Sequence, residues 1–597
     1  MPELQFKGKE FVYNYHLTVP YRPLVPEAGK SVGKPSLNEN LIIHGDNLHA
    51  LKALLPMYAG KVDCVFIDPP YNTGNEGWNY NDNVNSPMMK EWLSSNPVNA
   101  EDMLRHDKWC AMMWPRLTLL RELLSDNGSF WMTLDDNEIS NARGMLDEIF
   151  GAGNFVACIA WEKRYTRSNN ANRFYSLKDY IIVYRKTDAV SSIKEARNDK
   201  SDESYDNPDD DPRGPWMTAS YINPATKEKR KKLVYPIENP FSKKMVEHPT
   251  HAWKYKPSEH ARHVREKRLW WGKNGEAEYP RLKLFLSEMG NLVPVDLWDY
   301  QTTGTTDEGG TELKQIFGFA AFDTPKPRRL IERILRLVPK EDALVLDSFA
   351  GSGTTAHAVL ALNEQDGGNR RFILVEGEPY ADKLTAERVR RVIEGYEFEG
   401  TQKEELFRDS LTWTKLKNAD SLLAKVCDIE EVNAARFDSV TKTIKEGQLV
   451  VMGERKITER TEGLGGEFTY CTLGPELDVD KILTGEVLPD YLSVGAWLFH
   501  TATGEAFNAA KVIEKSWYLG ESAAYHVWLV YRPELDFLKS AAAALTLSLA
   551  EKIAKAKPSG KKHLVFAPAK YVPNSKLLPM GVEYAPLPFA LYRIEKG

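Results

Sequence analysis

The chain has 597 residues, which is too long for one hydrophobic core and predicts two or three domains. It is 42% hydrophobic and 27% charged, as expected of a globular protein, and no apolar run is long enough to cross a membrane. The net charge of −6 argues against a nucleic-acid partner unless basic residues are concentrated in one segment.

The five cysteines are scattered and form no C-x-x-C pair, which argues against a disulfide framework and against a zinc–thiolate site. There is no signal-peptide pattern, and the charged first residues lead us to expect a cytoplasmic protein.

Predicted strands and helices alternate over residues 41–186, after an expected N-terminal arm at 1–40 that contains two proline-rich stretches. The predicted elements are strands at 41–43, 62–67, 128–134 and 180–184, and helices at 47–58, 110–125 and 137–150. This alternation predicts an α/β fold with a mainly parallel sheet that helices cover on both faces.

The alternation stops between residues 187 and 310, a polar segment that we expect to be an inserted domain. It resumes over 311–397, with helices predicted at 328–337 and 381–395 and strands at 343–347 and 371–376. Residues 398–597 are expected to form a separate, mixed α/β C-terminal domain, with a strand at 524–530 and an Ala/Leu-rich helix at 537–556. No catalytic motif is visible in that last domain.

The tetrapeptide Asp68-Pro69-Pro70-Tyr71 directly follows the predicted buried strand at 62–67. The exocyclic amine of a nucleic-acid base is a poor nucleophile because its lone pair is delocalised into the ring. The Asp68 carboxylate and the rigidly held Pro69 carbonyl can accept hydrogen bonds from both N–H groups, which leaves the lone pair aimed at a methyl group. Tyr71 offers a face on which a flipped-out base can stack. All four residues are therefore candidate catalytic residues, and the alternative is an ordinary turn after a strand.

A glycine turn, residues 349–354, links the strand that ends at Asp347 to a predicted helix. Gly351 and Gly353 let the backbone approach a ligand closely, and the helix start favours a carboxylate or phosphate. Glu376, at the end of the next strand, can accept hydrogen bonds from ribose hydroxyls. A nicotinamide dehydrogenase would share these features, but it has no need of Asp-Pro-Pro-Tyr. The two motifs together therefore predict amino-methylation of a nucleic-acid base.

Three further acidic residues follow predicted strands. Asp46 can accept a hydrogen bond from the adenine amine of a cofactor, or it can cap the helix that begins after it. Asp135 and Asp136 can likewise line the site or cap a helix.

Basic residues concentrate between residues 225 and 273, where 14 lysines and arginines stand against 5 glutamates. Such a segment in an acidic chain predicts a surface that contacts phosphates, and the alternative is a solvated loop. The candidate DNA contacts are Lys229, Arg230, Lys231, Lys232, Lys254, Arg262, Arg265 and Arg268.

Four histidines of this segment have a spacing that could hold a metal: His248, His251, His260 and His263. Because no cysteine lies nearby, we expect no metal site here. Aromatic residues interleave with the basic ones and either stack on nucleic acid or form a small hydrophobic core; they are Trp253, Tyr255, Trp270 and Trp271.

The order of the motifs, with Asp-Pro-Pro-Tyr first, the basic insert next and the glycine turn last, resembles the permuted β class of DNA amino-methyltransferases. Longer matches are similar to the modification (Mod) subunits of type III restriction–modification systems. They lie at residues 68–75, 80–82, 134–138, 179–184, 324–327, 347–355 and 372–376.

The resemblance implies a Rossmann-like methyltransferase sheet with circularly permuted motif order. It implies transfer of a methyl group from S-adenosylmethionine to N6 of adenine in a short site of double-stranded DNA, without a metal. Residues 187–310 would recognise the target, and Lys326 would help to bind the cofactor. The full set of candidate cofactor-binding residues is Asp46, Lys326, Asp347, Phe349, Ala350, Gly351, Ser352, Gly353, Thr354 and Glu376.

The resemblance also implies a homodimer and association with a separate Res subunit that carries helicase and nuclease. The C-terminal domain would then make partner or dimer contacts. Two other functions remain open: methylation of N4 of cytosine, against which the aspartate before Pro-Pro argues, and a DNA-binding subunit that has lost the reaction. An RNA substrate is disfavoured by the permuted order with a large insert.

Overall fold

The computed structural model describes residues 3–73, 104–166, 174–190, 192–338, 340–411, 413, 417–445, 448–477, 488–557 and 560–587. The family-motif residues at 74, 75 and 80–82 lie outside these ranges. Within the described ranges, no helix is long and apolar enough to span a membrane.

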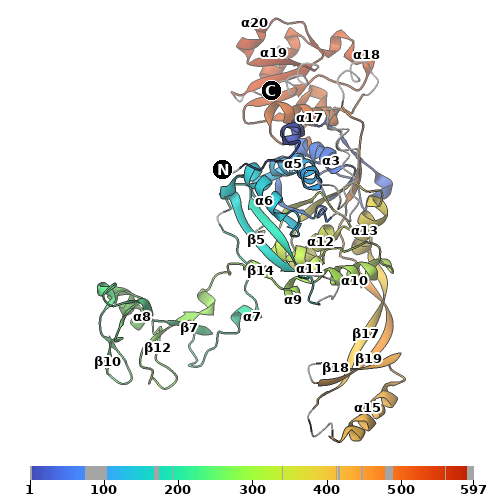
Figure 1. The fold of residues 1–597 in the computed structure, drawn as a ribbon. Helices are drawn as coiled ribbons and strands as arrows, with labels where there is room; N and C mark the ends of the chain where they lie inside the picture. The colour runs from blue at the N-terminus through green and yellow to red at the C-terminus, as the bar shows by residue number, and fades with distance from the viewer. Residues whose placement is uncertain are drawn as a thin grey trace. The chain divides into compact units, whose positions relative to one another are not determined.

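The chain forms two compact units, shown in Figure 1. Unit 1 comprises Met1–Ser191 and Val295–Gly597, and unit 2 comprises Ser192–Pro294. Unit 2 lies within the segment 187–310 that was expected to be an insert. The fold is mixed α/β, as predicted, with one large and mostly parallel sheet and several small sheets.

The large sheet of unit 1 has ten strands in the order β1-β20-β2-β16-β15-β3-β4-β6-β5-β14. Its central, mutually parallel strands are β2 (Leu41–His44), β16 (Arg371–Glu376), β15 (Leu344–Asp347), β3 (Val62–Ile67) and β4 (Leu124–Leu134). Every residue of β3 is buried, as expected of a strand covered on both faces. Strands β15 and β16 follow the insert in sequence but lie between β2 and β3 in space. The two halves of the domain therefore interleave in one sheet.

The outer strands of this sheet change direction. β6 (Lys178–Arg185) pairs antiparallel with β4, β5 (Phe155–Glu162) pairs antiparallel with β6, and β14 (Leu297–Trp298) completes this edge. At the other edge, β20 (Thr469–Leu473) lies beside β2, and β1 (Leu24–Pro26) lies beside β20. Residues assigned to a separate arm and a separate C-terminal domain thus supply strands to the main sheet. These strands are short, and they are specified by long-range pairing rather than by a local pattern.

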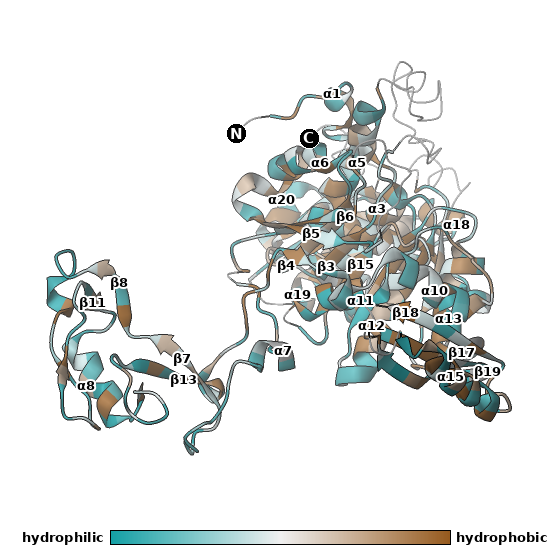
Figure 2. Cartoon of the chain, turned by 60° about the horizontal axis from the view of Figure 1, so that its bottom comes forward, coloured by the Kyte–Doolittle hydropathy of each residue, from teal (hydrophilic) through white to brown (hydrophobic). Residues whose placement is uncertain are grey.

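Helices cover both faces of the sheet, and the central strands β3, β4 and β15 carry the hydrophobic residues seen in Figure 2. α3 (Asn47–Tyr58) packs on α5 (Arg105–Leu123), and α11 (Arg328–Arg336) packs on α12 (Thr354–Asp366). α6 (Ile139–Leu146) packs on α5, and α13 (Glu387–Glu394) packs on α12. η2 (Asp147–Gly151) extends α6, and η6 (Ala381–Ala386) precedes α13.

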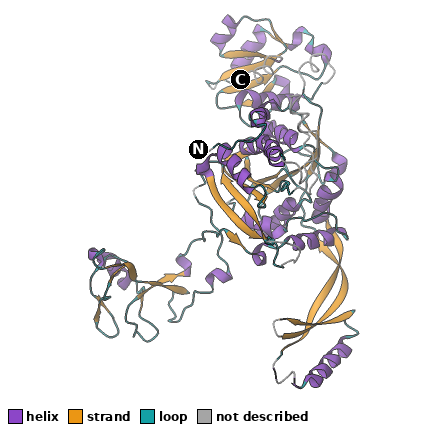
Figure 3. Cartoon of the chain, in the orientation of Figure 1, coloured by secondary structure: helices purple, strands orange, loops and turns teal. Residues whose placement is uncertain are grey.

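A three-stranded antiparallel extension follows α13. It consists of β17 (Gly395–Ser410), β19 (Gln448–Glu462) and β18 (Ser439–Lys445), with α15 (Ala419–Asn433) in the connection, and its long strands are visible in Figure 3. Beyond β20 lies a four-stranded sheet of β21 (Tyr518–Glu521), β22 (Tyr525–Leu529), β24 (Lys562–Ala567) and β26 (Val582–Pro586), flanked by α17 (Tyr491–Thr503).

The helix predicted at 537–556 is wrong over its first half. The structure has α18 (Leu535–Leu538), then η9 (Ala541–Ala543), then the short strand β23 (Ala544–Leu545), and only then α19 (Leu547–Ala556). β23 pairs with β25 (Ala569–Lys570), and the Thr546 hydroxyl accepts a hydrogen bond from the Leu549 amide at the start of α19. Strand pairing and this N-cap outweigh the helix propensity of the alanine run.

Unit 2 combines small sheets around an aromatic core. β7 (Trp216–Ser220), β13 (Arg281–Phe285) and β12 (Leu269–Trp270) form one sheet, and β8 (Ile222–Thr226) pairs with β11 (His251–Trp253). A hairpin of β9 (Ile237–Glu238) and β10 (Met245–Val246), and the helix α8 (Pro257–Arg265), complete the unit. The core is formed by Tyr221, Ile237, Trp253, Trp271 and Leu282.

Candidate active site

The two sequence motifs meet at one edge of the large sheet. β3 pairs in parallel with β15, with Cys64 opposite Val345 and Val65 opposite Leu346. Because the register is parallel, the turn after β3 and the turn after β15 leave the sheet side by side. Asp68 and the glycine turn therefore lie next to each other at the carboxyl edge, where open α/β sheets bind ligands.

The Asp68 carboxylate has a donor on each oxygen. The Thr133 hydroxyl, at the end of β4, donates to Oδ1, and the Lys326 ammonium donates to Oδ2. The same ammonium lies 5.0 Å from the centre of the Tyr71 ring. These contacts hold the carboxylate in one orientation beside the aromatic face. Lys326, predicted to bind the cofactor, thus lies against the Asp-Pro-Pro-Tyr turn.

The Asp-Pro-Pro-Tyr turn is supported from α5. The indole N–H of Trp109 donates to the Pro70 carbonyl at 2.7 Å. No described residue donates a hydrogen bond to the Pro69 carbonyl. The Pro70 carbonyl therefore has a donor within the protein. The neighbouring Pro69 carbonyl, which is predicted to bind the base, has none in the described ranges.

Tyr71 is half-buried, and its hydroxyl lies 3.3 Å from Asp179 Oδ2 on β6. The Lys163 ammonium holds the other oxygen of Asp179 at 2.6 Å. Burial, together with the nearby Asp68 and Asp179 carboxylates, raises the pKa of Tyr71 well above its ordinary value, so the ring is neutral. Burial also raises the pKa of Asp179. No local sequence pattern indicates a chemical role for Thr133, Lys163 or Asp179, although Asp179 begins one of the family-like motifs.

The glycine turn has a backbone that only glycine adopts readily. Gly351 has φ +51° and Gly353 has φ +77°. The Glu376 carboxylate accepts from the Gly351 amide at 2.7 Å and from the Glu378 amide at 2.9 Å. Burial raises the pKa of Glu376. Glu376 therefore clamps the turn, at the position predicted for a ribose acceptor.

Asp347 lies at the end of β15 and is buried. It accepts from the Thr355 hydroxyl at 2.6 Å and from the Phe349 amide at 3.0 Å. Burial is the largest cause that raises its pKa to about 7, and the charges of Asp68 and Glu376 add to it.

The side chains of Ser352 and Thr354 face the protein interior. The fully buried Arg388 guanidinium donates to the Thr354 hydroxyl at 2.8 Å and to the Ser352 hydroxyl at 3.1 Å, and its charge is paired with Glu312 at 3.0 Å. Burial lowers the pKa of Arg388. Of the predicted cofactor residues, these two are therefore available to a ligand through their backbone only. Ala350 is buried, and its amide donates to the Val375 carbonyl at 3.1 Å.

The turn has the features that a nucleotide-like cofactor requires. The Ser348 hydroxyl is buried and makes no hydrogen bond with any described residue. Phe349 next to it is half-buried and packs against the core. At Gly353, a Cβ atom would lie 3.0 Å from the Thr385 carbonyl oxygen. A buried hydroxyl without a partner, beside a turn that excludes side chains, fits a polar ligand at this edge.

Asp46 caps the helix α3, whereas Asp135 and Asp136, the pair after β4, make other contacts. Asp46 accepts from the Leu48 and His49 amides at the start of α3, and its other oxygen pairs with Arg116 at 3.3 Å. Asp135 accepts from the Asn137 amide at 2.9 Å. Asp136 instead contacts Lys178 and Tyr180. The capping alternative is therefore the one observed for Asp46, and its contact with a cofactor remains a prediction.

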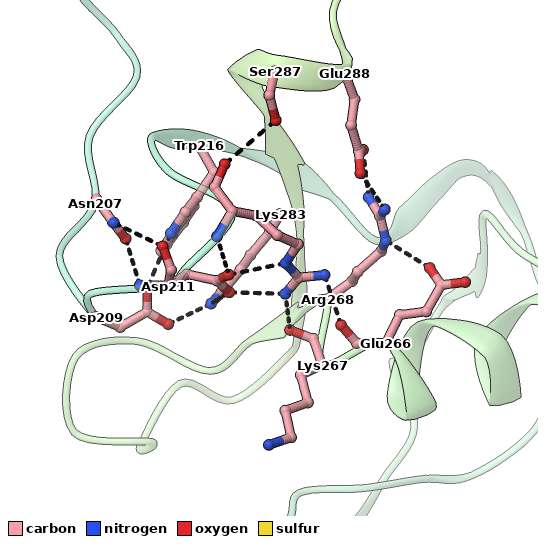
Figure 4. A network of polar contacts seen from close by, with 11 residues as sticks. Asn207, Asp209, Asp211, Trp216, Glu266, Lys267, Arg268, Lys283, Ser287 and Glu288 are labelled. Atoms are coloured by element: carbon pink, nitrogen blue, oxygen red, sulfur yellow. Dashed lines mark hydrogen bonds and ion pairs between the residues drawn. The ribbon is translucent and has the colours of Figure 1, made fainter.

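The predicted DNA contacts lie on unit 2. Seven of them are exposed, namely Lys229, Arg230, Lys231, Lys232, Lys254, Arg262 and Arg265. Arg268 differs: it donates to Glu266 at 2.7 Å and holds Glu288 with two hydrogen bonds, as Figure 4 shows. The pKa of Arg268 is raised above its ordinary range, chiefly by the hydrogen bonds to Glu288. Its geometry indicates a structural role.

The same network continues around Lys283, whose buried ammonium pairs with Asp209 and Asp211 (Figure 4). The Asp211 carboxylate is also held by Arg213, and the hydrogen bonds of Arg213 are the largest cause that lowers its pKa. Within unit 2, this network connects β13 to the loop before β7.

The histidines and aromatic residues of unit 2 contact one another. The Tyr221 hydroxyl lies 3.2 Å from His260 Nδ1 and 3.0 Å from His263 Nδ1, while His248 and His251 are in edge-to-face contact. In the described ranges, no three His, Cys, Asp or Glu residues are grouped as a metal site would require. Trp253 and Trp271 are buried in the core of the unit, so for these two residues the small-core alternative is the observed one.

A family model described as DNA methylase, the N6/N4 methylases, matches residues 62–387, which is more than half of the chain. The chain belongs to this family. The resemblance inferred from the motifs is therefore confirmed, and so is the predicted cofactor class, S-adenosylmethionine.

Three relatives illustrate the similarity. The type III restriction-modification enzyme StyLTI Mod subunit of Salmonella typhimurium is 33% identical over 62% of this chain and 58% of its own length. The EcoPI Mod subunit of Escherichia phage P1 is 32% identical over 58% of each chain. The type II methyltransferase M.KpnI of Klebsiella pneumoniae is 32% identical over 56% of this chain and 79% of its own. The chain thus matches little more than half the length of the Mod subunits.

Solved structures are more distant. The PvuII DNA methyltransferase, described as cytosine-N4-specific, has a TM-score of 0.31 and 14% identity, covering 58% of this chain and 86% of its own. The M1.HpyAVI complex with S-adenosylmethionine has a TM-score of 0.28 and 16% identity, covering 58% of this chain and 99% of its own.

Proposed function

We propose that this DNA methylase is a sequence-specific methyltransferase that modifies N6 of a flipped-out adenine. The observation that carries the proposal is the position of Asp68, next to Tyr71 and beside the glycine turn, at one edge of the sheet. An amine acceptor and a cofactor turn at the same edge are what methylation of an exocyclic amine requires.

Asp68 and the Pro69 carbonyl would accept the two N–H groups of the amine. The Thr133 and Lys326 contacts fix the carboxylate before the base arrives, so little reorganisation is needed when the amine binds. The Lys326 ammonium would share Oδ2 with the amine, because a carboxylate oxygen can accept two hydrogen bonds. Tyr71 would stack on the extruded base, held by its hydroxyl contact with Asp179.

The cofactor S-adenosylmethionine would supply an electrophilic methyl group. We place it on the turn formed by Phe349, Gly351 and Gly353, with the unpartnered Ser348 hydroxyl as an additional contact. The backbone amides at the start of α12 would hold its carboxylate, and Glu376 would accept from the ribose hydroxyls while it clamps the turn.

The choice of adenine over cytosine rests on the aspartate before Pro-Pro, in agreement with the resemblance to Mod subunits. We further propose that the chain is the modification subunit of a type III restriction–modification system. Unit 2 would recognise the target, as its exposed basic residues suggest. The residues beyond β17 would contact a second copy or a Res subunit, and the Mod relatives support such partners.

The test is single-molecule sequencing of genomic DNA from cells that express the wild-type chain or the Asp68→Ala variant. N6-methyladenine at one short motif, present only with Asp68, would support the reaction, the base and the specificity together. Methylation of cytosine N4 would keep the chemistry and overturn the base. The Asp68→Ala protein should still bind S-adenosylmethionine, because Asp68 has no role in the glycine turn, and loss of that binding would contradict the assigned roles.

A further inference from the structure

Asn72 directly follows the catalytic tetrapeptide and has a backbone conformation that is rare for residues with side chains. Its φ is +60°, and it is completely buried. Asparagine is among the few residues that adopt this left-handed region, and they do so when the surroundings hold them there. The conformation of Asn72 sets the direction in which the chain leaves Tyr71.

The side chain that holds Asn72 is Glu138. The Asn72 amide donates to Glu138 Oε1 and, at 3.1 Å, to the Arg105 carbonyl. Glu138 also accepts from His106 Nδ1 at 2.6 Å and from Asn141 at 2.8 Å. Glu138 is fully buried, and it stands at the N-cap of α6 without capping that helix through its side chain. Its carboxylate is directed at the turn after β3 instead.

Burial of a carboxylate costs free energy, because its charge loses contact with water. Burial raises the pKa of Glu138, which means that its charged form is disfavoured in this position. Well-packed apolar residues in place of a whole buried ion pair are often neutral or stabilising. The stability of α6 and β3 therefore does not explain this residue, whereas the conformation of Asn72 does.

The contacts on α5 give this network a second attachment. His106, which binds Glu138, and Trp109, which binds the Pro70 carbonyl, are three residues apart and lie on one face of the helix. Pro70 is thus fixed directly by α5, and Asn72 is fixed by Glu138 and by the Arg105 carbonyl. The two attachment points flank Tyr71.

We propose that Glu138 is a positioning residue for methyl transfer: through Asn72 it holds the Asp68–Tyr71 turn in the geometry that accepts the base. This inference rests on the proposed function. A displacement of catalytic groups by about 1 Å can lower a rate by about 100-fold, so loss of this attachment should lower kcat to a similar extent. Binding of S-adenosylmethionine should be unaffected, because Glu138 has no contact with the glycine turn.

The experiment compares Glu138→Leu with Glu138→Gln and with the matched control Glu148→Leu. Glu148 is a partly buried glutamate that binds Lys9 and the Leu4 amide, outside the network. Methyl transfer is measured with tritiated S-adenosylmethionine and whole-genome-amplified bacterial DNA, which contains short sites unmethylated. We expect a fall in kcat of about 100-fold for Glu138→Leu with cofactor affinity unchanged, and a lower melting temperature because the buried Asn72 amide loses an acceptor. The Gln variant keeps an acceptor for Asn72 and should recover most of the rate. The control, which also removes hydrogen bonds of a partly buried carboxylate, should keep the wild-type kcat.

A double-mutant cycle tests the route of the effect. Glycine in place of Asn72 has no side chain for Glu138 to hold, and it adopts a φ of +60° without strain. In an Asn72→Gly background, Glu138→Leu should therefore cost much less than it does alone. Equal costs in both backgrounds, or parallel loss of cofactor binding by Glu138→Leu, would overturn the inference. An inactive wild-type chain would instead overturn the proposed function, and the inference with it.

Discussion

The two glycines that flank α12 offer a direct test of the cofactor turn. Gly353 is the N-cap of α12, and Gly367 is its C-cap, with φ +77° and +72°. Alanine in this left-handed region costs about 1–2 kcal/mol at either position. A Cβ at Gly353 would also lie 3.0 Å from the Thr385 carbonyl oxygen, whereas a Cβ at Gly367 would have nothing within 4 Å. The two substitutions therefore share the backbone strain and differ in the close approach.

The short distance between a Cβ at position 353 and the Thr385 carbonyl should affect cofactor binding. The Thr385 hydroxyl donates to the Gly351 carbonyl at 2.6 Å, so a residue that pushes Thr385 away also displaces the turn. We expect Gly353→Ala to lower the affinity for S-adenosylmethionine about tenfold, which corresponds to about 1.4 kcal/mol. Gly367→Ala should lose a comparable free energy of unfolding to backbone strain and keep the wild-type affinity.

Isothermal titration calorimetry with S-adenosylmethionine measures the affinities, and denaturant unfolding measures the stabilities. An unchanged affinity for Gly353→Ala would refute the placement of the cofactor on this turn. An equal fall in affinity for both variants would show that the effect comes from strain in α12, and it would refute the reasoning from the Thr385 contact.

Two further predictions concern pH dependence and DNA binding. The pKa of Asp347 is raised to about 7, so its contribution to stability is fully present below its ordinary pKa and is lost as the pH rises through about 7. Asp347→Asn cannot ionise, so its advantage over the wild type in free energy of unfolding should be about 3 kcal/mol larger at pH 8 than at pH 5. Chemical denaturation at the two pH values measures this change, and a constant difference between the two proteins would contradict the assigned burial effect. In unit 2, replacing the exposed Lys231 and Lys232 by alanine should weaken binding to duplex DNA. The slope of log K against log salt concentration should become shallower by about 2, because two phosphate contacts are lost. Fluorescence anisotropy across a salt series measures this slope. As a control, alanine at the exposed Lys539 should leave the slope unaltered. An unchanged slope for the double variant would show that Lys231 and Lys232 do not contact DNA phosphates.

The sequence alone determined the elements that carry the motifs. α3 spans Asn47–Tyr58, β3 spans Val62–Ile67 and β16 spans Arg371–Glu376, with the bounds expected from apolar runs and turn residues. These segments are predictable because a strand buried on both faces needs a continuous apolar run, and because proline and glycine end it. The candidate catalytic turn and the glycine turn could be named for the same reason: their chemistry is local to a few consecutive residues.

The tertiary structure decided which side chains complete the site. Thr133 and Lys326 reach Asp68 from distant parts of the chain, Asp179 reaches Tyr71 from β6, and Glu138 reaches Asn72 from the start of α6. None of these pairings has a local signature, because they depend on which strands are neighbours. The pairing of β4 with β3 brings Thr133 and Glu138 to the turn after β3, and the pairing of β6 with β4 brings Asp179 there. The break of the predicted helix at 537–556 has the same origin, since β23 is specified by its partner β25 rather than by its own residues. Local sequence set where strands, helices and turns occur, and the register of the sheet set which polar groups meet at its edge.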